Sequence, residues 1–237
     1  MKTTGREPGK SDRAIIHLGG RVTAGRADKT LCRPGELGAV LEWTISHSDG
    51  RVREQRRQKS RSYLRQFLEL LRVQMLAAAE VLPIYLKDVT GSWREVAVSA
   101  LNFQCLAAAN DDSYGIVVGT GSTLPTLDDY ALQNKVAHGS GAGQLQYGGV
   151  TFGLPTSDAT TAHFTVTRDF SNVSGSPLTI YEMGLYVKGD SPLPWVVSRY
   201  DNSLRYHFCT LRDVIPAGIT ILSGETLTVN YRQQCVV

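Results

Sequence analysis

The stretch HFTVTRDF, from His163 to Phe170, decides the fold class of this 237-residue chain. Large side chains alternate with small polar ones at every second position, which is typical of a β-strand with one buried face. The buried face would comprise Phe164, Val166, Arg168 and Phe170, and the opposite face Thr165, Thr167 and Asp169. A guanidinium on an apolar face needs hydrogen-bond acceptors. Arg168 should therefore meet main-chain carbonyls or a carboxylate, for which Glu182 is a candidate.

The same period of two recurs along the chain from Ile84 onward. Segments with strand character lie at residues 95–107, 114–121, 143–153, 162–172, 178–188, 194–200, 205–211 and 226–237. Gly, Asn, Asp, Ser and Pro separate them, and no helical pattern intervenes. Many short strands joined by turns predict a mainly β fold over residues 83–237, namely an antiparallel β-sandwich of the jelly-roll or immunoglobulin-like kind.

One amphipathic helix is predicted before the sandwich, over residues 60–82. Ser60 or Ser62 could cap its start, and Pro83 would end it. Its apolar side chains form one stripe at helical spacing, made of Leu64, Phe67, Leu68, Leu71, Met75 and Ala78. A stripe this apolar needs to be covered, either by the β domain or by other copies of the chain. It is therefore more typical of a packing surface than of a cofactor site.

Residues 1–59 are predicted to form an extended basic N-terminal arm. Residues 1–38 contain few large apolar side chains, so burial cannot offset the entropy lost on ordering them. Residues 39–47 have strand character and Ser48-Asp49-Gly50 signals a turn, so a small hairpin could form there. Residues 1–72 hold 16 Lys+Arg and 8 Asp+Glu, a net +8, and residues 73–237 hold 9 and 14, a net −5, which together give the +3 of the whole chain.

A basic run lies at the end of the arm. It consists of Arg51, Arg53, Arg56, Arg57, Lys59 and Arg61. Two interpretations stay open, a solvated charge run or a contact with an acidic partner surface or with nucleic-acid phosphates. No aromatic residues interleave with the basic ones, so base stacking is not indicated and nucleic acid is the less favoured partner. The basic run and the helix stripe together are the candidate assembly residues.

Patterns for catalysis and cofactor binding are missing from the sequence. It has no phosphate-binding loop, dinucleotide fingerprint, nucleophile elbow or zinc-protease motif. The four cysteines and five histidines are dispersed without metal-ligand spacing. We therefore expect no catalytic residue, no cofactor and no metal, and the chain is not predicted to be an enzyme. No apolar run is long enough to span a membrane, and the first residues lack the apolar core of a secretory signal.

The glycine-rich stretch from Ser113 to Gly148 could be a binding site or a turn-forming region. Adjacent Asp128 and Asp129 would not point the same way, so they form a poor acid/base pair. Loop carboxylates that accept main-chain N–H bonds are the favoured interpretation. Gly119 and Gly121 would permit a tight turn after the preceding strand.

Glu182 interrupts the apolar strand segment LTIYEMGLYV, which runs from Leu178 to Val187. A catalytic glutamate would need a partner acid and a cleft, and neither is visible in the sequence. We interpret Glu182 as an acceptor for the N–H groups of a neighbouring turn, and Gly184 as the position of a β-bulge.

Three stretches resemble a module found in virion proteins of tailed bacteriophages, such as tail-fibre, collar and neck-associated proteins. They are GIVVGTGSTLPTLDDYALQNKVAHGSGAGQLQYGGVTF from Gly115, FTVTRDFSNVSGSPLTIYEMGLYV from Phe164 and VIPAGITILSGETLTVNYRQQCVV from Val214. The segment SRSYLRQFLELLRVQM, from Ser60, is similar to a helix that precedes the module in some of these proteins. The resemblance covers about residues 60–237 and leaves residues 1–59 without a counterpart.

The resemblance implies a structural virion protein of the neck, tail or fibre-attachment region, made in the host cytoplasm. It further implies a homo-oligomer that contacts portal or adaptor, tail or fibre subunits through the N-terminal arm and helix. It transfers no catalytic residue. Capsid decoration is a variant of this function. The alternative is a receptor- or glycan-binding module, with Trp195, Tyr200 and Tyr206 as an aromatic platform.

Overall fold

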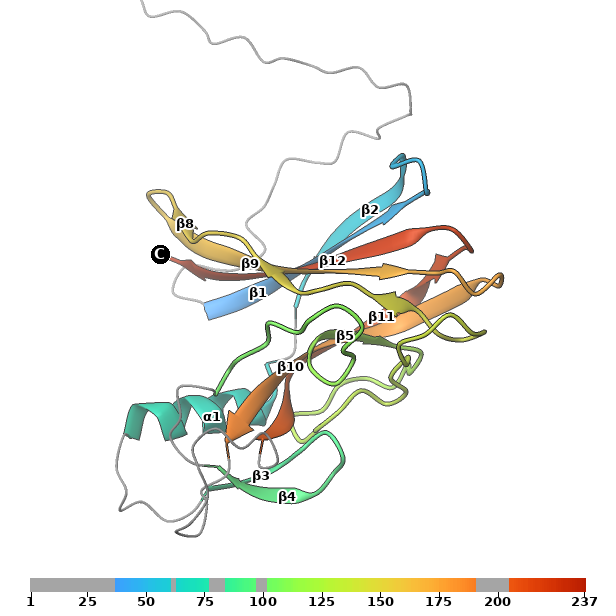
Figure 1. Cartoon of the computed structure of the whole chain (residues 1–237). Helices are drawn as coiled ribbons and strands as arrows, with labels where there is room; N and C mark the ends of the chain where they lie inside the picture. The colour runs from blue at the N-terminus through green and yellow to red at the C-terminus, as the bar shows by residue number, and fades with distance from the viewer. Residues whose placement is uncertain (1–36, 61–62, 77–83, 97–101, 191–204) are drawn as a thin grey trace, which may run out of the picture. The chain divides into compact units, whose positions relative to one another are not determined.

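The computed structural model describes residues 37–60, 63–76, 84–96, 102–190 and 205–237 (Figure 1). These residues form twelve strands and one helix. The elements are β1 (Leu37–Ser46), β2 (Val52–Lys59), α1 (Arg65–Leu76), β3 (Ile84–Lys87), β4 (Trp93–Val96), β5 (Gly115–Gly119), β6 (Gln146–Tyr147), β7 (Thr151–Phe152), β8 (Thr156–Ser157), β9 (Thr161–Ser171), β10 (Leu178–Asp190), β11 (Arg205–Ile221) and β12 (Thr226–Val236). No helix among them is long and apolar enough to cross a membrane.

Two antiparallel sheets make up most of the fold. The large sheet has the order β2-β1-β12-β9-β6, and the short strands β7 and β8 also pair with β9. The small sheet has the order β11-β10-β5, and β3 and β4 form a separate hairpin. Figure 1 shows the large sheet above the small one, with α1 beside the small sheet. The prediction of a mainly β chain built from antiparallel sheets with one helix is confirmed, and the arrangement is consistent with a β-sandwich.

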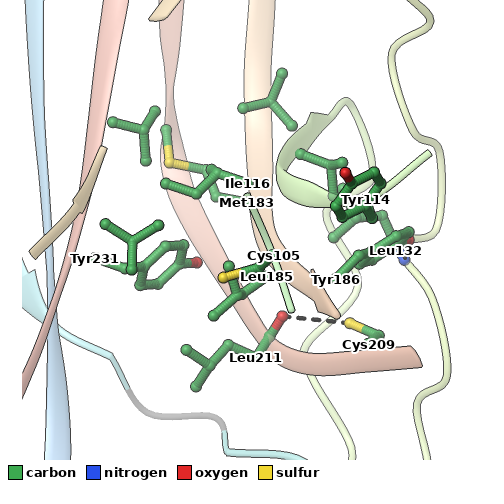
Figure 2. Packing of buried hydrophobic residues seen from close by; sticks show 14 of the residues in the cluster. Cys105, Tyr114, Ile116, Leu132, Met183, Leu185, Tyr186, Cys209, Leu211 and Tyr231 are labelled. Atoms are coloured by element: carbon green, nitrogen blue, oxygen red, sulfur yellow. Dashed lines mark hydrogen bonds between the residues drawn. The ribbon is translucent and has the colours of Figure 1, made fainter. Parts of the chain in front are cut away.

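Side chains from both sheets meet in one hydrophobic core. Tyr231 comes from the large sheet, and Met183 and Leu211 come from the small sheet (Figure 2). Cys105 and Cys209 are buried in the same core, where burial raises the pKa of the Cys105 thiol to about 12. Fully burying one large apolar side chain contributes roughly 1.5–3 kcal/mol, so this core is the main source of stability.

The predicted hairpin of the arm belongs to the large sheet. β1 lies between β2 and β12, and its register with β12 runs from Leu37 opposite Cys235 to Ser46 opposite Thr226. Alternate β1 residues, among them Leu41, Trp43 and Ile45, are buried in the core. The prediction that the arm extends to residue 59 is therefore wrong for residues 37–59, because this segment contributes side chains to the core. Residues 1–36 of the predicted arm lie outside the described part of the chain.

The helix is shorter than predicted. It begins at Arg65 and not near residue 60, because the preceding residues make other contacts. Ser60 does not cap it, since its hydroxyl donates to Asp213 Oδ2 at 2.7 Å, and the Leu64 N–H donates to the Thr210 carbonyl of β11 at 3.0 Å. Ser62 and residues 77–83, which include Ala78 and Pro83, lie outside the described residues.

The predicted strands match best where the alternation is long. β9, β10 and β12 lie where the pattern placed them. The strand predicted at residues 95–107 is wrong at residues 102–107, which form no strand, and residues 97–101 lie outside the described residues. The sheet register shifts on either side of Gly184, between Ile180 and Glu182 and between Leu185 and Tyr186, so the irregularity is not at Gly184 itself. The segment 194–200 falls outside the described residues.

Candidate functional site

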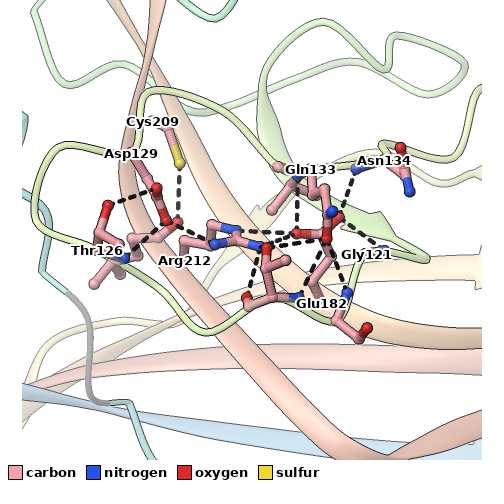
Figure 3. A network of polar contacts seen from close by, with 12 residues as sticks. Gly121, Thr126, Asp129, Gln133, Asn134, Glu182, Cys209 and Arg212 are labelled. Atoms are coloured by element: carbon pink, nitrogen blue, oxygen red, sulfur yellow. Dashed lines mark hydrogen bonds and ion pairs between the residues drawn. The ribbon is translucent and has the colours of Figure 1, made fainter.

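The first candidate for chemistry is a buried ionic network on the small sheet. Arg212 of β11 lies between Glu182 and Asp129 (Figure 3). Its Nε donates to Glu182 Oε2 at 3.0 Å, and its Nη1 lies 2.6 Å from Asp129 Oδ2. Its Nη2 donates to the Thr123 carbonyl at 3.0 Å. The guanidinium is thus held by three acceptors on the strand β10 and the loop 120–134.

Glu182 binds the same loop through its main chain. Its Oε1 accepts the N–H groups of Gly121 at 3.0 Å and Asn134 at 2.8 Å, and its Oε2 accepts the N–H of Gln133 at 3.0 Å. The interpretation of Glu182 as an acceptor for turn N–H groups is confirmed. Gly121 is required for a different reason than predicted, because a Cβ there would lie 2.5 Å from Glu182 Oε1.

Asp129 closes the outer side of the network. It accepts the Thr126 N–H at 3.0 Å and the Thr126 hydroxyl at 2.8 Å, which confirms its prediction as a loop carboxylate. Burial acts to raise the pKa of Asp129, but the hydrogen bonds from Thr126 and Arg212 lower it overall. Asp128 points elsewhere and pairs with Arg65 at 2.9 Å. The two adjacent carboxylates therefore share no partner.

This network is suited to holding two parts of the fold together and not to catalysis. Both oxygens of Glu182 are occupied, its side chain is fully buried, and Arg212 is almost fully buried. A reacting carboxylate needs an oxygen that a substrate can reach, and both Glu182 oxygens are buried and already bonded within the chain. Among the described residues, no group of three His, Cys, Asp or Glu side chains could hold a metal ion. The network instead fixes the loop 120–134 to the small sheet.

Arg168 is a second buried cation, and carbonyl groups surround it. Its Nε donates to the Gly148 carbonyl at 2.8 Å, and its Nη1 donates to the carbonyls of Tyr114 and Ile116 at 2.9 and 3.0 Å. Burial lowers the pKa of Arg168. The prediction that Arg168 meets main-chain carbonyls is confirmed. The prediction that Glu182 is its partner is wrong, because Glu182 pairs with Arg212. Arg168 joins β9 to the segment before β5.

The basic run lies on the edge strand β2 and is partly neutralised within the chain. Arg51 pairs with Asp49 at 2.6 Å and Arg53 with Glu225 at 2.8 Å. Arg56 pairs with Glu54 at 2.8 Å. Arg57 and Lys59 fall on the other face of the strand from Arg56, since they lie opposite Glu42 and Val40, and both make contacts of their own. Arg61 lies outside the described residues. The structure therefore does not gather the predicted basic residues on one face.

The helix stripe is also divided. Leu64 is buried and Phe67 is half-buried, with its ring 4.4 Å from that of Tyr63. Leu68 and Met75 are 62% and 76% exposed, and Leu71 is half-buried. The buried side of α1 carries Gln66, Leu70 and Val73 instead. The β domain therefore covers only part of the stripe, because α1 turns a different side toward β11, and coverage of Leu68 and Met75 by other copies of the chain stays a prediction.

Sequence reasoning missed an uncovered end of the large sheet. In β1, β12 and β9, residues opposite one another form rows on the core-facing side. Three rows are buried: Ile45–Leu227–Phe170, Trp43–Val229–Arg168 and Leu41–Tyr231–Val166. The strands of the large sheet continue for two more rows on this side, whereas β5, the edge strand of the small sheet, has only five residues.

These outer rows are largely apolar, and all their residues are exposed except buried Ala39 and half-buried Gln233. They are Ala39–Gln233–Phe164 and Leu37–Cys235–Ala162. Leu37 is 53% exposed and Phe164 37% exposed, and Phe164 stacks on Phe152 of β7 with ring centroids 6.4 Å apart. A groove of about 350 Å³ runs over them. We call Leu37, Phe152, Ala162, Phe164 and Cys235 the sheet end.

The aromatic platform predicted for glycans has one residue, Tyr206, in the described part of the chain. Trp195 and Tyr200 lie outside it. Tyr206 is half-buried beneath Arg94, whose guanidinium carbon lies 4.1 Å from the ring centroid. No family model matches the sequence, and no curated protein and no solved structure matches it either.

Proposed function

We propose that the chain is a structural component of a tailed-bacteriophage virion, in its neck, tail or fibre-attachment region. The resemblance of residues 60–237 to virion modules suggests this class. The proposal further holds that copies of the chain associate through the sheet end. Portal or adaptor, tail or fibre subunits would be the other partners, and the virion would be the place where the chain acts.

The sheet end is the observation that carries the proposal. Its apolar side chains continue the core-facing side of the large sheet, yet they are exposed within the chain. Covering a half-exposed Phe or Leu would contribute roughly 1 kcal/mol for each side chain. Repeated virion parts need such surfaces at every contact between neighbours. The exposed helix residues Leu68 and Met75 offer a second apolar contact.

We expect the basic run to contribute less to association than the sequence predicts. Arg51, Arg53 and Arg56 are already paired with acidic groups of the chain. The Arg51 and Arg56 pairs are largely exposed, and such pairs contribute about 0–1 kcal/mol and weaken with salt, whereas the Glu225 side chain in the Arg53 pair is buried. Contact of β2 with an acidic neighbour stays a prediction, and we expect it to tune the association that the sheet end drives.

Sedimentation velocity of the full chain tests the proposal. We expect a discrete multimer that persists as salt is raised, because apolar contacts are not screened. Phe164→Asp should shift the chain to a monomer. Thr165→Asp is the matched control, since Thr165 follows Phe164 on the same strand, faces the other side and lies opposite Arg232; it should leave the multimer intact. A monomeric unaltered chain, or equal effects of the two variants, would contradict the proposal.

A further inference from the structure

A small pocket lies where three segments meet away from the sheet end. The first turn of α1, the β3–β4 hairpin and the loop before Tyr130 enclose about 300 Å³. Its lining includes Arg65, Gln66, Lys87, Trp93, Leu127 and Asp128. This volume is at the small end of the roughly 300–1,000 Å³ typical of ligand sites, so it suits a single ring-sized ligand.

One wall is aromatic and carries a cation. Trp93 is 57% exposed and lies opposite Lys87 in the hairpin register, so the two side chains share a face. The Lys87 ammonium lies 5.4 Å from the Trp93 ring and 5.3 Å from the Tyr130 ring. Tyr130 can approach because Gly91 has no side chain: a Cβ there would lie 3.2 Å from the Tyr130 ring. An aromatic face is thus presented next to three N–H donors.

The opposite wall supplies both donors and acceptors. Arg65 pairs with Asp128 at 2.9 Å, and both side chains are largely exposed. Within the described residues, no carboxylate lies at ion-pair distance from Lys87. Its ammonium group contacts the Trp93 and Tyr130 rings. The pocket therefore combines one ammonium without a carboxylate, one guanidinium and one carboxylate around an exposed aromatic ring.

The walls of this pocket are held in place without a ligand. Gln66 Nε2 donates to the Lys87 carbonyl at 2.7 Å and ties α1 to the hairpin. Buried Asp88 accepts the N–H groups of Thr90 and Ser92 at 2.9 and 3.1 Å and Arg94 Nε at 2.7 Å, which fixes the hairpin turn. A pocket formed in advance loses less entropy on binding.

We infer that this pocket binds a sugar that carries a carboxylate, such as a uronic acid. The carboxylate pairs with Lys87, which lacks an acidic partner. The pyranose ring packs its C–H groups on the face of Trp93, because that face is the electron-rich side of the aromatic ring. The hydroxyls bond to Arg65 and Asp128, which offer donors and acceptors side by side. This inference does not depend on the assembly proposed above.

The probes are methyl glucuronide, methyl glucoside as its neutral counterpart, and acetate as a bare carboxylate. Saturation-transfer NMR on the full chain detects binding, and titration ranks the affinities. We expect the glucuronide to bind about tenfold or more tightly than the glucoside, because its carboxylate adds a charge-assisted hydrogen bond to Lys87. Trp93→Ala should weaken both sugars at least about tenfold, and Lys87→Gln should abolish the preference for glucuronide.

Tyr85→Ala is the matched control. Tyr85 is an exposed aromatic residue on the same face of the hairpin but does not line the pocket. Its substitution should leave both affinities unchanged. The inference is overturned if no probe binds, if acetate competes as well as the glucuronide, if the glucoside binds equally tightly, or if Tyr85→Ala weakens binding as much as Trp93→Ala.

Discussion

Replacing Glu182 by Gln should remove much of the stability of the fold. The amide keeps the shape of the carboxylate but offers only one acceptor oxygen. If that oxygen keeps the Gly121 and Asn134 N–H groups, the new NH₂ faces the Gln133 N–H and Arg212 Nε, which are donors too. Two hydrogen bonds are lost, and Arg212 keeps Asp129 as its only carboxylate.

The expected loss is about 3–5 kcal/mol, the usual cost of breaking a buried ion pair on one side. Domains of this kind have roughly 5–15 kcal/mol of stability in total, so the effect would be about a fifth of it or more. Asp128→Asn is the matched control. It makes the same chemical change in an ion pair whose aspartate is 73% exposed, where about 0–1 kcal/mol is expected.

Urea denaturation followed by circular dichroism measures the difference. The midpoint for Glu182→Gln should fall well below that of the unaltered chain with little change in the slope, which would show that the folded state itself has lost stability. Asp128→Asn should unfold close to the unaltered chain. A loss in the free energy of unfolding under about 1 kcal/mol for Glu182→Gln, or equal losses for the two variants, would refute the stabilising role assigned to this network.

Three more predictions concern stability. Arg168→Met should lower the free energy of unfolding by about 3 kcal/mol or more in urea denaturation, because buried carbonyls lose their donors; a neutral effect would mean that water replaces the guanidinium. The hydrogen bonds that lower the pKa of Asp129 contribute stability that is fully present above about pH 4 and is lost as pH falls through the lowered pKa. Acid unfolding should therefore be less steep for Asp129→Asn, and an unchanged acid limb would contradict this. Deletion of residues 1–59 should abolish cooperative thermal unfolding because it removes β1, whereas a chain that begins at Leu31, where the compact unit starts, should keep it; cooperative melting of the shorter chain would refute the role given to β1.

The strands that sequence predicted well are those whose signal is local. In β9 the alternation from Phe164 to Phe170 sets which side chains lie on the core-facing side, whatever the strand pairs with, although Phe164 at the sheet end stays exposed. The position of β1 was not predictable in this way, because it depends on pairing with β12 at the other end of the chain. Because the residues before β1 include few large apolar side chains, sequence reasoning places β1 in the arm.

The helix and the buried charges show a second limit. α1 has apolar residues on more than one side, so spacing alone could not decide that Leu70 and Val73 face the sheet while Leu68 and Met75 do not. The Glu182–Arg212 pair had a usable signal, because each charge sits inside an apolar strand and must find a partner there. The sheet end had no such signal in the sequence, because the exposure of its side chains depends on how far one sheet extends beyond the other.

The pairing of β1 with β12 also sets when the chain can begin to associate. Leu37 lies opposite Cys235, so β12, which is synthesised after the other described strands, completes the row that β1 begins. Contacts so distant in sequence form slowly. The exposed rows at the sheet end take shape only with this closure, so we expect nascent chains to lack the surface through which finished copies would recognise one another. Synthesis itself would then delay assembly until β12 has been made.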